Sequence, residues 1–368
     1  MKKKILFLLH VPPPVHGSSM VGKYIMDSGL INENFDTRYI NLGTSSSVDE
    51  IGKGGLKKLI KYFKIIFQTL TQIFFYKPNL AYIAMTAKGG AFYKDVLIAF
   101  LLKAFHIPLV IHFHNKGVSV NQEKKIDNFL YQKVFKNSKI ILLSKYLYSD
   151  IQKYVAEKDV YYCPNGIPEL VVKEIKRENR NGIVNLLFLS NLIASKGVFI
   201  LLEALHILDE KNIDFTCTFI GGEGDINAAS FNIKVKELGL SDKVKYLGRK
   251  YGDEKNEYFS ASHVFVFPTY YHNECFPLVL LEAMQFSLPI ISTFEGGIPD
   301  LIVNGVNGFL VKQQLVAELS DNISILIEDA DLRIAMGEDG RKRFQEHFTI
   351  SIFEQTLCKI LTQITTQS

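Results

Sequence analysis

Short apolar runs alternate with longer helical patterns along most of the chain. Runs rich in Ile, Val, Leu and Phe predict buried strands in the first half, at residues 3–10, 36–42, 79–85, 107–114, 138–144 and 159–164. The same kind of run predicts strands in the second half, at residues 184–190, 215–222, 243–248, 262–268, 288–293 and 308–311. Continuous apolar strands separated by helices are typical of parallel sheets covered on both faces. We therefore predict an α/β fold with two Rossmann-like, doubly wound domains.

The break between the two blocks is predicted where turn residues are followed by a charged stretch without a strand pattern. This places a first domain at 1–167, a linker at 168–182 and a second domain at 183–348. A last helical segment at 349–368 is able to pack back on the first domain.

Composition narrows the class of protein. The chain has 368 residues, 47% of them hydrophobic and 22% charged, as in an ordinary globular protein. Its four cysteines are far apart, which argues against a disulfide framework or a zinc site and for a reducing compartment. The apolar run Ile5–Leu9 is too short for a signal peptide, and no run approaches the roughly 18 apolar residues of a membrane span. We expect a cytoplasmic protein.

The charge is unevenly distributed. Residues 1–167 hold 23 Lys and Arg against 11 Asp and Glu, whereas residues 168–368 hold 19 against 27. A basic half suggests an anionic partner. Apolar residues recur at helical spacing from Leu56 to Leu70, among five lysines at positions 53, 57, 58, 61 and 64. This pattern fits a helix at an anionic membrane surface and, equally, a surface helix that packs its apolar side on the sheet. No nucleic-acid motif accompanies the charge.

Two carboxylates frame an apolar segment directly after a predicted strand. Glu274 and Glu282 bracket seven residues, and Pro277 fits the first turn of a helix that would begin near Phe276. A helix N-terminus attracts phosphate, so a nucleoside diphosphate there would bring one carboxylate near the attached group and the other near ribose hydroxyls. The alternative is a helix cap together with a solvated glutamate.

The longer stretch from Asn273 to Val311 resembles the donor-site signature of retaining glycosyltransferases of the GT4 family, which have the GT-B fold. The shared elements are Glu274, Glu282, the turn at 296–300 and the segment at 305–311. The resemblance implies two domains facing a cleft, a UDP- or GDP-sugar donor and transfer to an acceptor hydroxyl with retention. It also implies that Glu274 faces the donor sugar, that Glu282 binds the ribose, and that neither a cofactor nor a metal is needed.

The same resemblance implies further donor contacts. Lys196 matches the phosphate-binding lysine of the family, whereas Asn191 stands where the family commonly has arginine. Pro277 replaces a glycine and removes one backbone donor, which leaves Phe276 and Leu278 to supply N–H groups to the diphosphate.

The first domain contributes two candidates. Gly17 matches the second glycine of a family loop that closes over the donor phosphates, and the alternative for this loop is a simple turn into a helix capped by Ser18. His114 matches a histidine that lines the donor sugar and is a candidate catalytic residue. His112 is expected to point to the opposite face and to pack in the core, so that the pair does not bind metal.

Two glycine- and acid-rich motifs are interpreted as structural. Residues 221–226 lack the third glycine of a dinucleotide fingerprint, and Asp329–Asp331 fits a boundary between helices. The resemblance therefore leads to a metal-independent hexosyltransferase of bacterial surface polysaccharide or glycolipid assembly. Its acceptor would be a glycan or a lipid-linked sugar at the inner face of the plasma membrane. The alternatives are a GT-B-fold nucleotide-sugar epimerase and a non-catalytic nucleotide-sugar-binding protein.

Overall fold

The computed structural model describes residues 2–44, 55–170 and 182–367. Most of the expected linker, residues 171–181, and Lys53 of the basic segment therefore lie outside the described residues.

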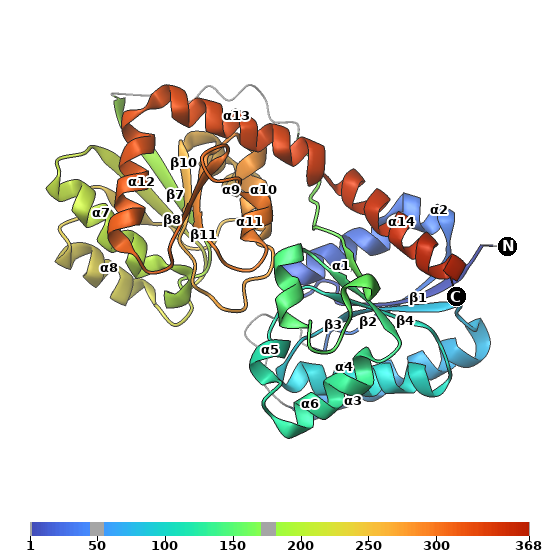
Figure 1. The fold of residues 1–368 in the computed structure, drawn as a ribbon. Coiled ribbons are helices and arrows are strands. Elements are labelled where there is room, and N and C mark those ends of the chain that lie inside the picture. Colours follow the sequence, from blue (N-terminus) through green and yellow to red (C-terminus); the bar gives the residue numbers. More distant parts are fainter. Residues whose placement is uncertain (1, 45–54, 171–181, 368) are drawn as a thin grey trace. The chain divides into compact units, whose positions relative to one another are not determined.

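The chain divides into two compact units. Unit 1 comprises Met1–Gly166 and Ile350–Ser368, and unit 2 comprises Ile167–Thr349 (Figure 1). Pro168 and Leu170 are held to unit 2, because the side chain of Gln285 accepts from the Leu170 N–H at 2.8 Å and donates to the Pro168 carbonyl at 3.2 Å.

Unit 1 is built on a six-stranded sheet. Its strands are β1 (Lys4–Leu9), β2 (Asp36–Asn41), β3 (Leu80–Met85), β4 (Leu109–Phe113), β5 (Ser138–Leu142) and β6 (Val160–Tyr162). They lie in the order β2-β1-β3-β4-β5-β6, and every pairing is parallel. The central strands β1, β3 and β4 are buried along nearly their whole length, which explains why their sequences are continuous apolar runs.

Helices cover both faces of this sheet, as Figure 1 shows. One face carries α1 (Gly17–Asp27), α2 (Gly29–Asn34) and the C-terminal α14 (Ile350–Gln367), which packs against α2. The other carries α3 (Leu56–Thr71), α4 (Gly89–Ala104) and α6 (Lys125–Phe135). A single π-helical turn, η2 (Gln72–Tyr76), continues α3. The shorter elements are α5 (Val118–Asn121) and the 3₁₀ turns η3 (Lys145–Asp150) and η4 (Glu157–Asp159).

Unit 2 repeats this plan. Its strands are β7 (Val184–Leu189), β8 (Phe215–Ile220), β9 (Val244–Tyr246), β10 (Val264–Phe267), β11 (Ile290–Thr293) and β12 (Gly308–Val311). They form a second parallel sheet in the order β12-β11-β10-β7-β8-β9. The predicted α/β class with two doubly wound parallel sheets is thus confirmed.

The helices of unit 2 follow its strands in alternation. They are η6 (Ala194–Lys196), α7 (Val198–Glu210), α8 (Ala228–Glu237), α9 (Gly252–Ala261), α10 (Leu278–Gln285), α11 (Ile298–Leu301), α12 (Val316–Glu328) and α13 (Ala330–His347). Asp329 lies between α12 and α13, and its side chain caps α13 by accepting from the Leu332 N–H at 2.8 Å. The boundary role predicted for the acidic motif at 329–331 is confirmed. No helix in the described ranges is long and apolar enough to cross a bilayer.

Candidate active site

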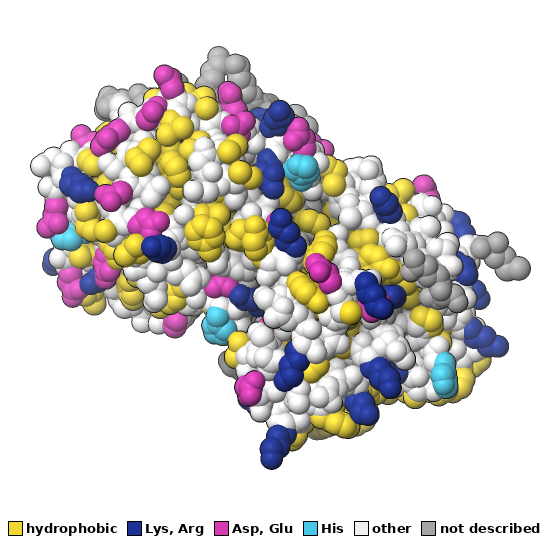
Figure 2. Space-filling model, viewed as in Figure 1, with side chains coloured by type: hydrophobic (Ala, Val, Ile, Leu, Met, Phe, Trp, Pro, Cys, Tyr) yellow, Lys and Arg dark blue, Asp and Glu magenta, His cyan; other side chains and the backbone are white. Residues whose placement is uncertain are grey.

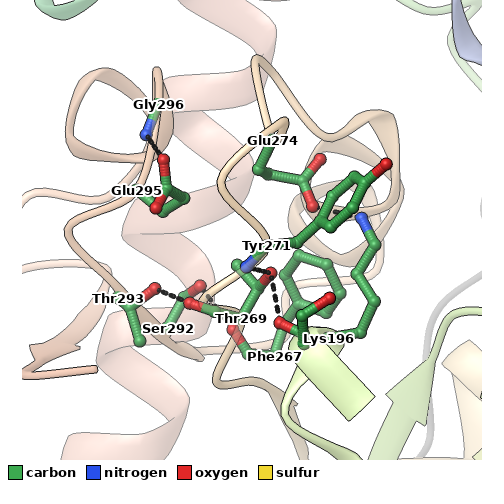
Figure 3. A network of polar contacts seen from close by, with 10 residues as sticks. Lys196, Phe267, Thr269, Tyr271, Glu274, Ser292, Thr293, Glu295 and Gly296 are labelled. Carbon is green, nitrogen blue, oxygen red and sulfur yellow. Dashed lines mark hydrogen bonds and ion pairs between the residues drawn. The ribbon is translucent and has the colours of Figure 1, made fainter. Parts of the chain in front are cut away.

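Six of the eight predicted site residues lie in unit 2. Figure 3 shows the part of the site at the carboxyl ends of β10 and β11, with Lys196 reaching over from the loop after β7. Ligands of open α/β sheets bind beyond this edge, because the connecting loops there differ in direction and leave backbone groups exposed. The remaining two, Gly17 and His114, belong to unit 1.

Lys196 and Glu274 form an ion pair, and both side chains are largely buried, with exposed fractions of 14% and 10%. The ammonium also lies 4.5 Å from the centre of the Tyr271 ring and 5.4 Å from that of Phe267. Ring faces attract a cation, and the carboxylate neutralises it, so two charges that would be costly to bury singly are held together. The site thereby presents a fixed cation beside a fixed carboxylate.

Backbone contacts hold the loop after β10 against the loop after β7. The Tyr270 N–H donates to the Ser195 carbonyl at 2.8 Å, and the Tyr271 N–H donates to the Thr269 hydroxyl oxygen at 3.1 Å. The Glu274 N–H donates to the Tyr271 carbonyl at 2.7 Å. The loop that carries Glu274 is therefore fixed to the segment that carries Lys196.

The Gly-Gly turn after β11 packs on the backbone of Glu274 and Cys275. Gly296 has φ +56°, and a Cβ placed on it would lie 2.3 Å from the Glu274 carbonyl oxygen. The Gly297 N–H donates to the Cys275 carbonyl at 2.6 Å. Only glycine fits at position 296, because the conformation is left-handed and the space for a side chain is already filled. Glu295 beside it is buried and accepts from Gln313 at 2.7 Å.

Helix α10 begins later than predicted. Its first residue is Leu278, and Pro277 is the N-cap with ψ 116°, so Pro277 precedes the first turn instead of forming part of it. The reason is that proline at this position has an extended backbone, which delays the helix by two residues. No side chain of the described residues caps the first turn, and its backbone donors include the N–H of Leu278. Phe276 is buried, with its ring edge against Phe348 at 5.9 Å between centroids.

Glu282 lies on α10 and is paired with Lys255 of α9 at 2.6 Å. Their side chains are 28% and 21% exposed, so Glu282 is partly buried and ion-paired instead of freely solvated. Sequence reasoning missed Lys255, because the two residues are 27 positions apart and the local pattern of α9 gives no sign of a pairing.

Asn191 stabilises the turn at Gly222 and, unlike an arginine at this position, carries no positive charge. Its side-chain oxygen accepts from the Gly222 N–H at 3.0 Å. A cation does lie at this turn: a Cβ placed on Gly222 would be 2.2 Å from Nε of Arg249, so the guanidinium packs directly on the glycine. Arg249 lies three residues after Tyr246, the last residue of β9, and was also missed, because Gly222 is 27 positions away from it in the sequence.

In unit 1, Gly17 is the first residue of α1, and a Cβ placed there would meet nothing within 4 Å. The packing of the protein therefore does not require glycine at this position. The cap of α1 is His16, not Ser18 as the alternative proposed: the His16 ring accepts from the Ser19 N–H, and the Ser19 hydroxyl oxygen accepts from the His16 N–H at 3.0 Å. Serine acts here at the third helical position of a reciprocal cap.

His114 follows β4, and the prediction that His112 points to the opposite face is wrong. The two rings lie 4.2 Å apart, because residues two positions apart on a strand share a face. The Tyr82 hydroxyl is 2.5 Å from Nδ1 of His112. Burial, followed by the nearby His10 and His16, lowers the pKa of His114 to about 3. His114 is therefore neutral near pH 7 and suited to hydrogen bonding instead of proton transfer.

The two histidine rings each bury one nitrogen atom. Nδ1 of His114 and Nε2 of His112 are buried, and no hydrogen-bond partner for them lies in the part of the chain that is described. Across residues 2–44, 55–170 and 182–367, no group of three or more His, Cys, Asp or Glu side chains is placed to hold a metal ion.

Comparison with known proteins shows that the chain is similar to glycosyltransferases. Residues 172–343, nearly all of unit 2, match the family model of glycosyl transferases group 1, which confirms the resemblance to glycosyltransferases without testing the GT4 assignment. An uncharacterized glycosyltransferase of Methanocaldococcus jannaschii is 28% identical over 70% of this chain and 69% of its own length. The capsular polysaccharide biosynthesis glycosyltransferase CapM of Staphylococcus aureus is 28% identical over 51% of this chain. The matched region covers about half (48%) of the length of CapM.

The fold has close counterparts among solved structures. HepE of Anabaena, in complex with UDP and glucose, superposes with a TM-score of 0.73 over 98% of this chain and 99% of its own, at 18% identity. The two parallel sheets with flanking helices thus have the GT-B fold.

Proposed function

We propose that the protein is a retaining glycosyltransferase that moves a sugar from a UDP- or GDP-linked donor to an acceptor hydroxyl. The observation that carries this proposal is the buried Lys196–Glu274 pair, set at the carboxyl edge of the sheet and backed by the turn at Gly296. A fixed cation beside a fixed carboxylate suits a ligand that joins a diphosphate to a polyol.

Each site residue receives a role in this proposal. Lys196 and the N–H groups of Phe276 and Leu278 bind the diphosphate, and Arg249 supplies the second cation at the turn that Asn191 holds. Glu282 accepts hydrogen bonds from the ribose, and Lys255 orients it. Glu274 faces the donor sugar.

Two residues of unit 1 also receive roles in this proposal. Neutral His114 donates a hydrogen bond to the sugar, and Gly17 lets the backbone approach the phosphates closely. Departure of the diphosphate is stabilised electrostatically by these fixed groups, and the diphosphate itself helps deprotonate the acceptor on the same face of the sugar.

The acceptor is proposed to be a glycan or a lipid-linked sugar of bacterial surface polysaccharide assembly, at the cytoplasmic side of the membrane. The name of CapM, a relative in capsular polysaccharide biosynthesis, supports this choice. No cofactor and no metal take part.

A donor panel tests the proposal. The protein is incubated with UDP- and GDP-sugars, with and without a membrane lipid extract or soluble alkyl glycosides, and the release of nucleoside diphosphate is measured. Release that depends on both one donor and an acceptor supports the proposal. Conversion of the donor sugar without acceptor would indicate the epimerase. Thermal stabilisation by a donor with no turnover under any condition would indicate the non-catalytic binding protein.

A further inference from the structure

Helix α3 turns only a narrow, partly polar face toward the body of unit 1. Its buried residues are Tyr62, Ile65 and Thr69. The Tyr62 hydroxyl donates to the Lys94 carbonyl on α4 at 2.8 Å, and the Thr69 hydroxyl donates within the helix to Ile65 at 2.9 Å. The packing of α3 on the unit is thus achieved without most of its large apolar side chains.

Those large apolar side chains lie in solvent. Each is between 49% and 73% exposed: Leu56, Leu59, Ile60, Phe63 and Phe67. The sequence left open whether the apolar side of this helix packs on the sheet, and the structure shows that it does not. An exposed row of this kind over roughly three helical turns is unusual on a soluble surface and marks an interaction site.

The π-helical turn η2 extends the row with aromatic rings. Phe74 and Phe75 are 54% and 84% exposed, while Ile73 and Tyr76 on either side of them are buried. The Tyr76 hydroxyl donates to the Asp36 carbonyl and anchors the turn to the sheet. The Phe74 ring packs edge-on against Phe105 at the end of α4, with centroids 5.1 Å apart. A π turn widens the helix and so presents two consecutive phenylalanines outward.

In the described residues of α3 and η2, every charged side chain is a lysine. Lys57, Lys58, Lys61 and Lys64 accompany the apolar row on α3, and no acidic residue occurs between Glu50 and Asp95. Figure 2 shows more blue Lys and Arg side chains over unit 1 and more magenta acidic ones over unit 2. A second copy of the chain would bring the same positive face and be repelled. A nucleic-acid duplex would leave the exposed leucine, isoleucine and phenylalanine side chains in water, because its bases are already stacked on one another.

We propose that the outer face of α3 and η2 docks unit 1 on an anionic lipid surface. The phenylalanines enter the boundary between headgroups and acyl chains, and the positive charge of the lysines attracts the headgroup phosphates. Each lysine near such a surface contributes roughly 1 kcal/mol, and this attraction is screened by salt. The proposal does not depend on the sugar that the protein transfers.

Vesicle flotation tests the proposal. The full-length protein is mixed with vesicles of phosphatidylcholine, with and without phosphatidylglycerol, at low and high salt. We expect binding only to vesicles that contain phosphatidylglycerol, reduced at least tenfold at high salt. The variant Lys57→Glu/Lys58→Glu/Lys61→Glu should lose this binding, and Phe74→Ser/Phe75→Ser should weaken it at least tenfold even at low salt.

Two matched control variants distinguish binding through α3 and η2 from a general effect of net charge or of exposed apolar side chains. Lys145→Glu/Lys153→Glu/Lys158→Glu changes the net charge of unit 1 equally, from exposed positions near β5 and β6 at the other edge of the sheet. Ile233→Ser/Ile334→Ser removes two exposed apolar side chains from unit 2. Both should bind like the original protein, and circular dichroism checks that all variants fold.

Three outcomes would overturn the proposal. They are no flotation of the original protein at low salt, equal losses in the α3 variant and its charge control, and association into dimers through this face without vesicle binding.

Discussion

The ammonium of Lys196 donates to the carboxylate of Glu274, 78 positions further along the chain, and both charges are nearly enclosed. In the proposed mechanism Glu274 faces the donor sugar, so Glu274→Ala should chiefly reduce turnover, by roughly 100-fold in kcat, with little change in donor affinity. Steady-state rates and calorimetric donor binding separate the two effects. A variant with full kcat would remove Glu274 from the reaction.

The same pair predicts a stability effect that must be measured alongside activity. Glu274→Gln leaves the Lys196 ammonium buried without its partner and should cost about 3 kcal/mol of unfolding free energy, whereas Lys196→Met/Glu274→Gln removes both charges and should cost less. Urea unfolding gives these values. A double variant as unstable as the sum of its single variants would show that the two charges do not interact.

Glu282 is predicted to act in nucleotide binding. Glu282→Ala removes the acceptors for the ribose hydroxyls and should weaken binding of the nucleoside diphosphate roughly 10- to 100-fold, while kcat at saturating donor changes little. Lys255→Met is the matched variant: it leaves the carboxylate in place without its 2.6 Å partner and should give a smaller loss. Calorimetry with UDP and GDP measures both. Unchanged affinity in Glu282→Ala would refute the assignment.

Gly296 is predicted to be irreplaceable for a steric reason. Gly296→Ala would place a methyl group 2.3 Å from the Glu274 carbonyl oxygen at a left-handed φ and should cost roughly 3 kcal/mol. Gly239 also has a positive φ, +71°, but open space around it, so Gly239→Ala should cost only about 1 kcal/mol. Thermal unfolding compares the two, and equal losses would contradict the contact with Glu274.

The buried histidines predict a pH dependence of stability. Burial lowers the pKa of His114 from 6.5 to about 3. Between these two pH values His114 is protonated in the unfolded chain and neutral in the folded chain. Stability should therefore fall as the pH drops from 6.5 toward 3, by up to about 1.4 kcal/mol per pH unit for each such group. His10, with its pKa lowered to about 4, acts in the same direction.

One buried carboxyl group opposes this trend. Burial raises the pKa of Asp95 to about 7, so the folded chain holds a proton that the unfolded chain has lost. The comparison of His114→Gln with the original protein isolates the histidine, because Asp95 is common to both. The variant should lose less stability between about pH 6 and pH 4 in urea unfolding. Parallel curves would show that His114 titrates normally.

The donor site is predicted to work without a metal ion. Lys196, Arg249 and the N-terminus of α10 would supply the positive charge that a divalent cation supplies elsewhere. Transfer should therefore persist in EDTA. Complete loss of activity, restored by magnesium or manganese, would contradict the assigned donor site.

The apolar runs were sufficient to predict all six strands of each sheet, because strands buried on both faces leave a continuous hydrophobic signal. Helix starts were less accurate: Pro277 delays α10, and His16 takes the capping position expected for Ser18. The facing of His112 and His114 was misassigned although the period of two in a strand fixes it.

Other features of the site depend on contacts distant in sequence. Lys255 pairs with Glu282 across two helices, and Arg249 packs on Gly222 from the next strand end, which no local pattern reveals. The sequence also did not determine which face of α3 is exposed. Apolar residues at helical spacing give the same sequence pattern whether they pack on a sheet or face solvent.

The proposed function requires that unit 2 binds a nucleotide-sugar donor and that the sugar of this donor is transferred at Glu274. The most direct measurement follows a labelled sugar from the active donor into an acceptor, with NMR of the product. We expect labelled product with the anomeric configuration of the donor, formed by the original protein and at least tenfold more slowly by Glu274→Ala. A donor that binds but whose label never reaches an acceptor, or transfer at an unchanged rate in Glu274→Ala, would contradict it.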